Sequence, residues 1–154
     1  MLELLLLGGC DINAWVRDDW TPPLADASFD PELVGWLVEH GADPNAQCRY
    51  DITALSIAAG SASREVIELA RRGDDFVELL LSKGGSPNAL MFHDHPVSFC
   101  QFECLGLGTS LHEAVLHRHD RLVRLLLNHG ANPQIRDSLG GLPQVKRLLF
   151  STAL

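Results

Sequence analysis

The sequence predicts an all-α fold: a solenoid of stacked helix-turn-helix units with hairpin-like finger loops between them. Three observations support this prediction. A glycine-led segment recurs four times along the 154 residues, an apolar stretch with helical spacing precedes each copy, and a helix start follows three of the copies at one fixed distance. A single pair of short helices cannot bury its apolar face alone, so neighbouring pairs must stack.

The repeated segment marks the end of each second helix. Its copies begin at Gly9, Gly41, Gly84 and Gly130, which lie 32, 43 and 46 residues apart. Glycine tolerates the left-handed conformation that commonly ends a helix, so we expect one helix to end before each copy. The apolar stretches that form these helices are residues 4–7, 33–38, 76–81 and 122–127.

For three of the four copies, the start of the next helix is predicted at a fixed distance after the repeated segment. Thr21, Thr53 and Leu142 each lie eight residues after the Asn or Gln of the preceding copy. Thr109 follows Asn88 by 21 residues, so this loop contains thirteen additional residues. The stretch from Thr53 to the third glycine is also extended, and either one long helix or an additional short helix would account for it.

Acidic residues stand where the second helices are expected to begin. Asp30 precedes Pro31, and both residue types favour the start of a helix. Asp120 precedes the fourth apolar stretch, and Asp74 with Asp75 precedes the third. We therefore expect these carboxylates to cap the second helices.

The two linked motifs resemble those of the ankyrin repeat family over nearly the whole chain. Thr109-Ser-Leu-His-Glu-Ala114 matches the family's Thr-Pro-Leu-His-x-Ala start, while Thr53-Ala-Leu-Ser-Ile-Ala58 and Thr21-Pro-Pro-Leu24 match it less well. The glycine-led segments match its Gly-Ala-Asp-x-Asn-Ala ending. Because both ends of the chain lack half a unit, we expect a fragment of a longer array. The resemblance implies one domain, residues 1–154, with units at approximately 1–20 (partial), 21–52, 53–108 (with insertions), 109–141 and 142–154 (a partial cap).

The resemblance also implies a function. Loop tips and first helices of ankyrin proteins bind other proteins, so we expect a non-catalytic module that binds a protein or peptide on its concave and finger face. Trp, Tyr and Arg are enriched at the energetic centres of interfaces, although in these loops they could instead pack on neighbouring fingers. The residues expected to lie outside the core and contact the partner are Trp15, Arg17, Trp20, Arg49, Tyr50, Phe92 and Arg136.

Charge and composition limit the classes of partner that the chain is expected to bind. The formal net charge is −8 and the pI about 5.2, which argues against broad nucleic-acid binding. Residues 1–117 carry 6 Lys/Arg against 18 Asp/Glu, whereas residues 118–154 carry 6 against 2. The acidic part favours a partner of basic character, although an acidic surface that keeps the protein soluble explains it equally well. No apolar run suits a membrane-spanning helix, and four cysteines without a secretion signal indicate reduced thiols in the cytoplasm or nucleus.

The inserted loop, residues 90–108, carries the residues for an alternative function. Catalysis would require its histidines to meet Glu113 and His117 around a pocket, whereas the family's histidine at His112 makes a structural hydrogen bond. Two histidines and two cysteines could bind zinc, but their spacing is not a recognised zinc pattern. We expect no metal and no cofactor, and keep an ankyrin-fold enzyme or metal-binding protein as the alternative. The oligomeric state does not follow from the sequence. The candidate metal ligands are His93, His95, Cys100 and Cys104.

Overall fold

The computed structural model describes residues 2–14, 24, 30–47, 50–62, 67–93 and 108–145. Within these ranges the secondary structure is helical, with two isolated antiparallel bridges, Gln47 with Thr53 and Met91 with Gly108, and no strand. The prediction of an all-α solenoid is confirmed. The helices are α1 (Leu2–Leu7), α3 (Pro31–Glu39), α4 (Ala54–Ala62), α5 (Ile67–Ser82), α6 (Ser110–Leu116) and α7 (Asp120–Asn128).

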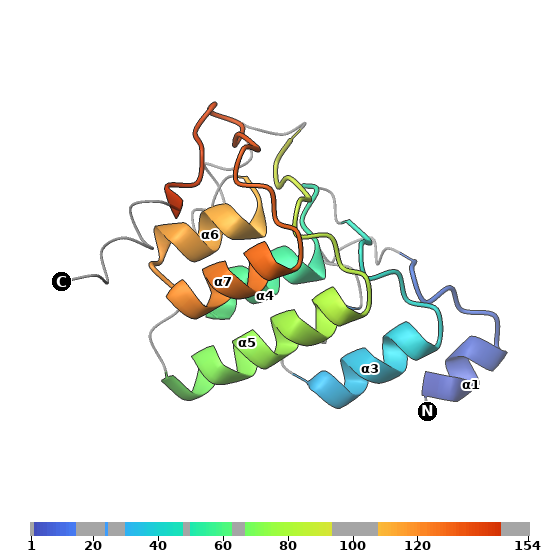
Figure 1. Ribbon diagram of the computed structural model, residues 1–154. Helices are drawn as coiled ribbons and strands as arrows, with labels where there is room; N and C mark the ends of the chain where they lie inside the picture. The colour runs from blue at the N-terminus through green and yellow to red at the C-terminus, as the bar shows by residue number, and fades with distance from the viewer. Residues whose placement is uncertain are drawn as a thin grey trace.

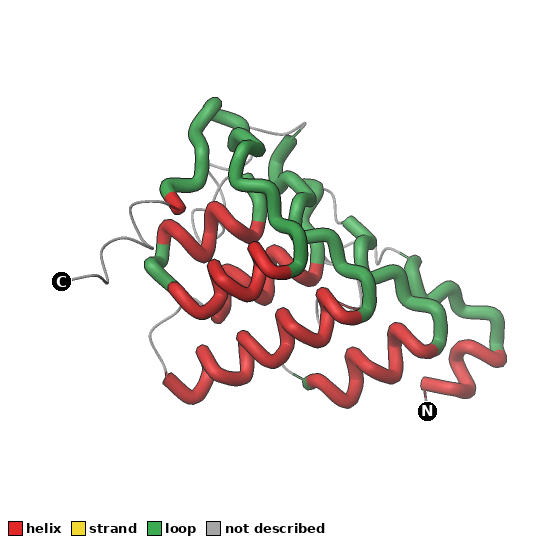
Figure 2. The backbone as a smooth tube through the Cα atoms, in the orientation of Figure 1, coloured by secondary structure: helices red, strands yellow, loops and turns green. Residues whose placement is uncertain are grey.

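The helices form two rows. The second helices α3, α5 and α7 lie side by side, with α1 at the end of their row (Figure 1). The first helices α4 and α6 form the other row, with α4 packed on α5 and α6 packed on α7. The loops between the units project together on one side of the helices (Figure 2). This arrangement is the stack of helix pairs that the repeated segments predict.

One continuous apolar core joins the units. The apolar positions of every helix from α3 to α7 face it, and Trp36 of α3 is partly buried against it. Leucine and valine at helical spacing supply most of this surface, so burial of the repeated apolar stretches is what holds neighbouring units together. In this core the fully buried large apolar residues are Val34, Leu55, Phe76, Val77, Leu80, Leu111, Leu122, Val123 and Leu126.

The predicted helix starts are correct for α3 and wrong for α5 and α7. The Asp30 carboxylate accepts hydrogen bonds from the N–H groups of Glu32 and Leu33. In α7, by contrast, the cap is His119, whose Nδ1 accepts the N–H of Leu122 at 3.1 Å. An imidazole nitrogen can accept the hydrogen bond of a free helix N–H as a carboxylate does. With His119 as the cap, the predicted cap Asp120 is the first residue of the helix.

Helix α5 runs without interruption from Ile67 to Ser82, so the extension after Thr53 belongs to one long second helix. Asp74 and Asp75 therefore lie within the helix and do not cap it. The carboxylate of Asp74 is buried and faces α7, where it pairs with basic side chains of the next unit. Asp74, which the sequence predicts as a helix cap, instead connects two units.

The four glycines that begin the repeated segments follow the ends of helices, as predicted. Gly9, Gly41, Gly84 and Gly130 all have positive φ angles, between 82° and 97°. This left-handed conformation is the one that glycine adopts at least cost, so it explains why glycine begins every copy of the repeated segment.

The asparagine of each repeated segment binds the next unit, and these bonds form a series that we call the asparagine ladder. Each side chain donates from Nδ2 to the carbonyl oxygen of the next glycine and accepts at Oδ1 the N–H two residues beyond it. Asn13 bridges to Gly41 and Asp43 (3.1 and 2.8 Å), Asn45 to Gly84 and Ser86 (3.0 and 2.6 Å), and Asn88 to Gly130 and Asn132 (3.1 and 2.8 Å).

Candidate protein-interaction surface

A second, smaller core lies beneath the finger loops. It consists of Tyr50, Ile52, Met91 and Phe92, and the two aromatic rings stack with their centroids 5.8 Å apart. Tyr50 is 6% exposed and Phe92 is 0% exposed, so the expectation that these two side chains lie outside the core is wrong. The inserted loop closes at the bridge between Met91 and Gly108, and this brings Met91 and Phe92 onto the preceding finger.

Hydrogen bonds join three consecutive fingers. The N–H of Phe92 donates to the carbonyl oxygen of Tyr50 at 2.8 Å, and the hydroxyl of Ser138 donates to the carbonyl oxygen of Phe92 at 3.4 Å. We call this joined surface the finger platform. Since its fingers pack on one another and share hydrogen bonds, the platform is a preformed surface. It comprises the described residues 47, 50–53, 91–93 and 135–141.

The last finger holds an apolar residue out to solvent. The Oδ1 atom of Asp137 accepts the N–H groups of Leu139 and Gly141, at 2.9 and 2.6 Å, and the Asp137 N–H donates to the Gly141 carbonyl. Arg136 donates from Nη1 to the carbonyl oxygen of Gly140 at 2.7 Å. Leu139, at the tip of this turn, is 78% exposed. The turn therefore fixes the backbone of a leucine whose side chain gains nothing from the fold.

His112 joins α6 to this finger. Its Nδ1 accepts the N–H of Thr109 at 3.1 Å and lies 3.0 Å from the Thr109 hydroxyl, while Nε2 lies 3.4 Å from the Gly141 carbonyl oxygen. Burial lowers the pKa of His112, and the Gly141 carbonyl and the Asp137 carboxylate oppose this shift. The expectation of a structural histidine at this position is confirmed.

The equivalent position in the preceding unit is Ser56, and it makes a more local set of contacts. Its hydroxyl accepts the N–H of Thr53 and donates to the Thr53 carbonyl, both at 2.9 Å. A serine hydroxyl is too short to reach the next finger as an imidazole does. The two finger junctions are therefore built differently: one by apolar packing of Tyr50 and Phe92, the other by His112.

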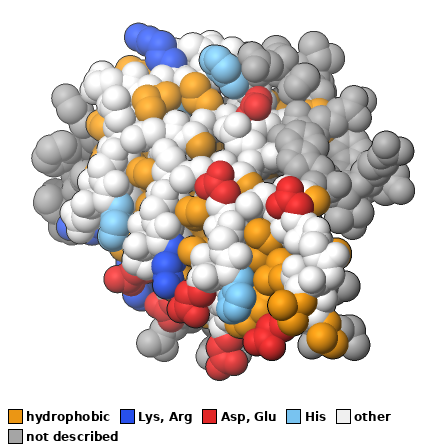
Figure 3. Space-filling view, turned by 90° about the vertical axis from the view of Figure 1, so that its right-hand side faces the viewer, with side chains coloured by type: hydrophobic (Ala, Val, Ile, Leu, Met, Phe, Trp, Pro, Cys, Tyr) orange, Lys and Arg blue, Asp and Glu red, His pale blue; other side chains and the backbone are white. Residues whose placement is uncertain are grey.

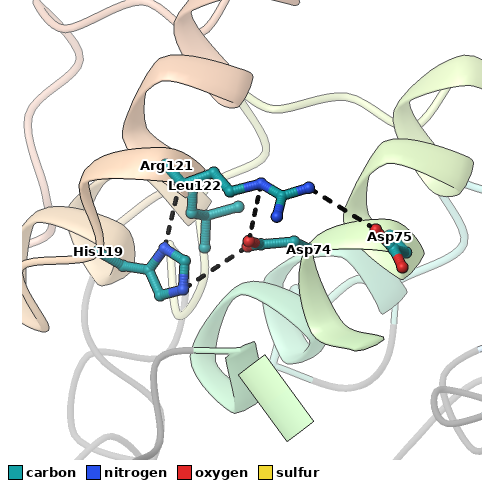
Figure 4. A network of polar contacts seen from close by, with 5 residues as sticks. All are labelled: Asp74, Asp75, His119, Arg121 and Leu122. Carbon is teal, nitrogen blue, oxygen red and sulfur yellow. Dashed lines mark hydrogen bonds and ion pairs between the residues drawn. The ribbon is translucent and has the colours of Figure 1, made fainter. Parts of the chain in front are cut away.

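An ionic cluster around the buried carboxylate of Asp74 connects α5 with α7 (Figure 4). Asp74 Oδ2 lies 3.2 Å from Nε of Arg121, and Asp74 Oδ1 lies 3.6 Å from Nε2 of His119. Arg121 also pairs with Asp75 at 3.8 Å. Burial raises the pKa of Asp74, and the charges of His119 and Arg121 oppose that rise. Because its carboxylate is enclosed between two helices, this cluster connects units and offers no open site.

Several candidate site residues lie outside the described residues, so their roles stay predictions. These are Trp15, Arg17, Trp20, Arg49, His95, Cys100 and Cys104. Of the other candidates, Arg136 and His93 are exposed on the fingers. Among the described residues, no group of three or more His, Cys, Asp or Glu side chains could hold a metal ion.

The described residues of the catalytic alternative do not lie together as one group, although Glu113 and His117 are close to each other. His93 is exposed on the third finger, His112 is engaged in its turn, and Glu113 is buried on α6, 3.6 Å from Nε2 of His117. None of the helices in the described ranges is both long and apolar enough to cross a membrane.

Leu139 is the contact candidate that sequence reasoning missed. The signal was present: Asp137-Ser-Leu-Gly-Gly141 reads as a tight turn with an apolar residue at its tip. The interface preference for Trp, Tyr and Arg does not select Leu139, because a single exposed leucine is common on protein surfaces and only the turn around it sets it apart.

Comparisons with known proteins agree with this architecture. Residues 108–138 match the family model "Ankyrin repeat", and residues 25–71 match "Ankyrin repeats (many copies)". The chain is 34% identical to Ankyrin repeat and SOCS box protein 6 of Homo sapiens, over 86% of this chain and 32% of that protein. It is 32% identical to Ankyrin repeat, SAM and basic leucine zipper domain-containing protein 1 of Ornithorhynchus anatinus, over 84% of this chain and 23% of that protein.

The chain thus spans about a third or less of the length of these relatives. The likeness covers the repeat units, and the repeats are the feature that the names of both relatives share. Two matching family models, the two rows of helices and the asparagine ladder lead to one conclusion: the chain belongs to the ankyrin repeat family.

Proposed function

We propose that this chain is a non-catalytic interaction module that binds a protein or peptide on its finger platform, with Leu139 as an apolar anchor. Ankyrin repeats are generally protein–protein interaction modules, which supports the class of function. The observation that carries the finer proposal is the exposed leucine on a turn fixed by Asp137 and Arg136.

The energetics favour such an anchor. Full burial of a leucine side chain contributes about 1.5–3 kcal/mol, so a partner that covers Leu139 gains this energy from one residue. The backbone of the turn is already ordered by its hydrogen bonds, so binding loses little further conformational entropy there. Joined fingers extend the same advantage across the platform.

The surroundings define the rest of the proposed surface. Arg136 is exposed beside Leu139 and adds a polar contact at the rim, while Trp15, Arg17, Trp20 and Arg49 extend the contact to the other finger loops. The acidic residues of the first three units favour a partner segment of basic character. The site of action that we propose is the cytoplasm or nucleus.

Selection from a random peptide library on the immobilised chain, followed by affinity measurement in solution, tests this function. A selected peptide should bind Leu139→Ser about tenfold more weakly than the unmodified chain, with an unchanged melting temperature. Leu4→Ser, which removes a similarly exposed leucine from α1, is the matched control and should bind as before. Equal binding by both variants, or a library that yields no binder, contradicts the proposal.

A further inference from the structure

The side chain of His119 lies between two units. The face of the molecule seen in Figure 3 has histidine side chains at its surface, and His40, His93 and His129 are all exposed. The His119 side chain, by contrast, is only 18% exposed, and its ring lies between α5 and the first turn of α7 (Figure 4). Its two ring nitrogens therefore face different parts of the fold.

The Nδ1 atom of His119 acts within its own unit. It accepts the N–H of Leu122 at 3.1 Å, and this bond caps α7. A hydrogen-bond acceptor needs a lone pair, so Nδ1 carries no proton in this arrangement and the proton of the neutral ring is on Nε2. The cap thus fixes the tautomer of the ring.

The Nε2 atom of His119 faces the neighbouring unit. It lies 3.6 Å from Oδ1 of Asp74 on α5, just beyond hydrogen-bond distance. The Asp74 side chain is 4% exposed, and among the described residues its Oδ1 atom has no hydrogen-bond partner. The other oxygen, Oδ2, lies 3.2 Å from Nε of Arg121. A buried acceptor without a hydrogen bond is costly, so a closer approach of the ring would stabilise the carboxylate.

The helix cap and the carboxylate compete for the same ring. A protonated imidazole carries an N–H on both nitrogens and accepts no hydrogen bond, so it cannot hold the Leu122 N–H. Its positive charge strengthens the attraction to Asp74, and charge-assisted bonds of this kind shorten to about 2.7–2.9 Å. Histidine is also the side chain whose charge ordinarily changes between about pH 5 and 8. Protonation of the ring therefore favours the carboxylate over the helix.

Asp74 is the competing site for the same proton, because burial raises its pKa. The remaining charges around the pair come from the three helices that meet here and from the turn before His119. The described groups are Asp74, Asp75 and Glu78 of α5, Glu113 of α6, Asp120, Arg121 and Arg124 of α7, and His117 and Arg118 of the turn.

We propose that His119 is a proton-dependent switch at the junction of the third and fourth units. With a neutral ring it caps α7, and with a protonated ring it leaves the Leu122 N–H and binds Asp74. Acid therefore exchanges a bond within the fourth unit for an ion pair between units. The first turn of α7 loosens while its connection to α5 strengthens. The switch lies in α5 and α7 and is independent of the partner site on the finger platform.

The second unit contains a matched position without a ring. Asp30 precedes Gly41 by eleven residues, as His119 precedes Gly130, and its carboxylate accepts the N–H of Leu33 at 3.1 Å. An aspartate carboxylate ordinarily stays ionised above about pH 5. The cap of α3 should therefore persist under conditions in which the cap of α7 is lost.

Nitrogen-15 NMR of the imidazole rings at pH 8 and pH 5 tests the proposal on the unmodified chain. His119 should carry its proton on Nε2 alone at pH 8 and on both nitrogens at pH 5. Amide hydrogen exchange should show that protection of the Leu122 N–H falls about fivefold relative to that of Leu33, because one helix cap is lost. A ring whose Nδ1 stays unprotonated at pH 5 overturns the proposal, since Asp74 or neither group then takes the proton. Equal losses at Leu122 and Leu33 also overturn it.

Two variants separate the roles of the ring and the carboxylate. His119→Asn keeps an acceptor at the cap position without a titrating ring, so the Leu122 N–H should stay protected at both pH values. Asp74→Asn removes the charge that attracts the protonated ring, so loss of the cap should require a lower pH. His129→Asn removes an exposed imidazole at the other end of α7 and should leave the switch unchanged. Acid-dependent loss of protection in His119→Asn, or an unshifted transition in Asp74→Asn, contradicts the proposal.

Discussion

The N–H of Phe92 hydrogen bonds to the carbonyl oxygen of Tyr50 at 2.8 Å, so the third finger lies directly on the second. The two residues also stack their rings, and both are buried. Two residues that a sequence places in separate loops thus form a single structural element.

Phe92→Ala is expected to destabilise the protein. Truncation of a buried phenylalanine typically costs about 3–5 kcal/mol, and we expect about 3 kcal/mol here because the second core is small. Urea denaturation measures the change, and Leu139→Ala is the control, with an expected effect within about 0.5 kcal/mol. Unchanged stability together with weaker peptide binding would instead make Phe92 a contact residue.

Acid should weaken the junction that His112 makes. Burial lowers the pKa of His112, so the folded state holds the neutral ring while the unfolded chain becomes protonated below about pH 6.5. Its contribution is therefore fully present above the unfolded pKa and is lost as the pH falls through that value toward the folded pKa. Urea denaturation at a series of pH values between 8 and 5 measures this loss.

His112→Ser is the variant that checks this assignment. It reproduces the Thr53 and Ser56 arrangement of the preceding unit, so the local turn should persist while the contact with Gly141 and part of the pH dependence disappear. His93→Ser, at an exposed finger position, controls for removal of an imidazole. If both variants keep the full pH dependence, the pH effect arises elsewhere.

Asp74→Asn is expected to leave the protein equally stable or more stable at pH 7. Burial raises the pKa of Asp74 despite the nearby basic groups, so the folded state disfavours the charged carboxylate. The stability that a raised carboxyl pKa contributes is present below the unfolded pKa and is lost as the pH rises through the folded pKa.

Denaturation at neutral and acidic pH compares the two proteins. The difference between Asp74→Asn and the unmodified chain should diminish as the pH falls below about 4, where the carboxyl is protonated in both states. Asp75→Asn removes the exposed neighbouring carboxylate and is the matched control. A large loss of stability at pH 7 for Asp74→Asn alone would show that attraction to His119 and Arg121 outweighs the burial of charge.

Asn45→Ala should weaken the contact between two units. It removes two hydrogen bonds across the boundary, to Gly84 and Ser86, and we expect a cost of about 1–2 kcal/mol because each bond contributes about 0.5–1.5 kcal/mol. Asn132→Ala removes an asparagine whose side chain, among the described residues, accepts only the N–H of Gln134. It should cost less, and an equal cost in urea denaturation would argue against a special role for the ladder.

The features that the sequence predicts well are those set by short-range rules. Helix ends at glycines such as Gly41 and the cap at Asp30 follow from backbone preferences of single residues, so they can be read from the chain. The continuous course of α5 through Asp74 is different. The basic groups that face the Asp74 carboxylate lie in and beside α7, more than forty residues later, so no local pattern reveals this partner.

The candidate surface was harder to predict for the same reason. Burial of Tyr50 and Phe92 depends on how the inserted loop returns to the fingers, and the spacing of repeats does not determine that path. Leu139 is conspicuous only once the bonds from Asp137 fix its turn. Contacts between distant loops decide which side chains face solvent, so residue type alone gave the wrong assignment for two aromatic residues.

The two finger junctions respond to different conditions. Apolar packing weakens on cooling, so the junction of Tyr50 and Phe92 loosens in the cold, whereas the imidazole junction at His112 loosens in acid. Temperature therefore acts mainly on the junction of the second and third fingers, and pH on the junction at His112. The affinity of a ligand that contacts all three fingers would depend on both temperature and pH.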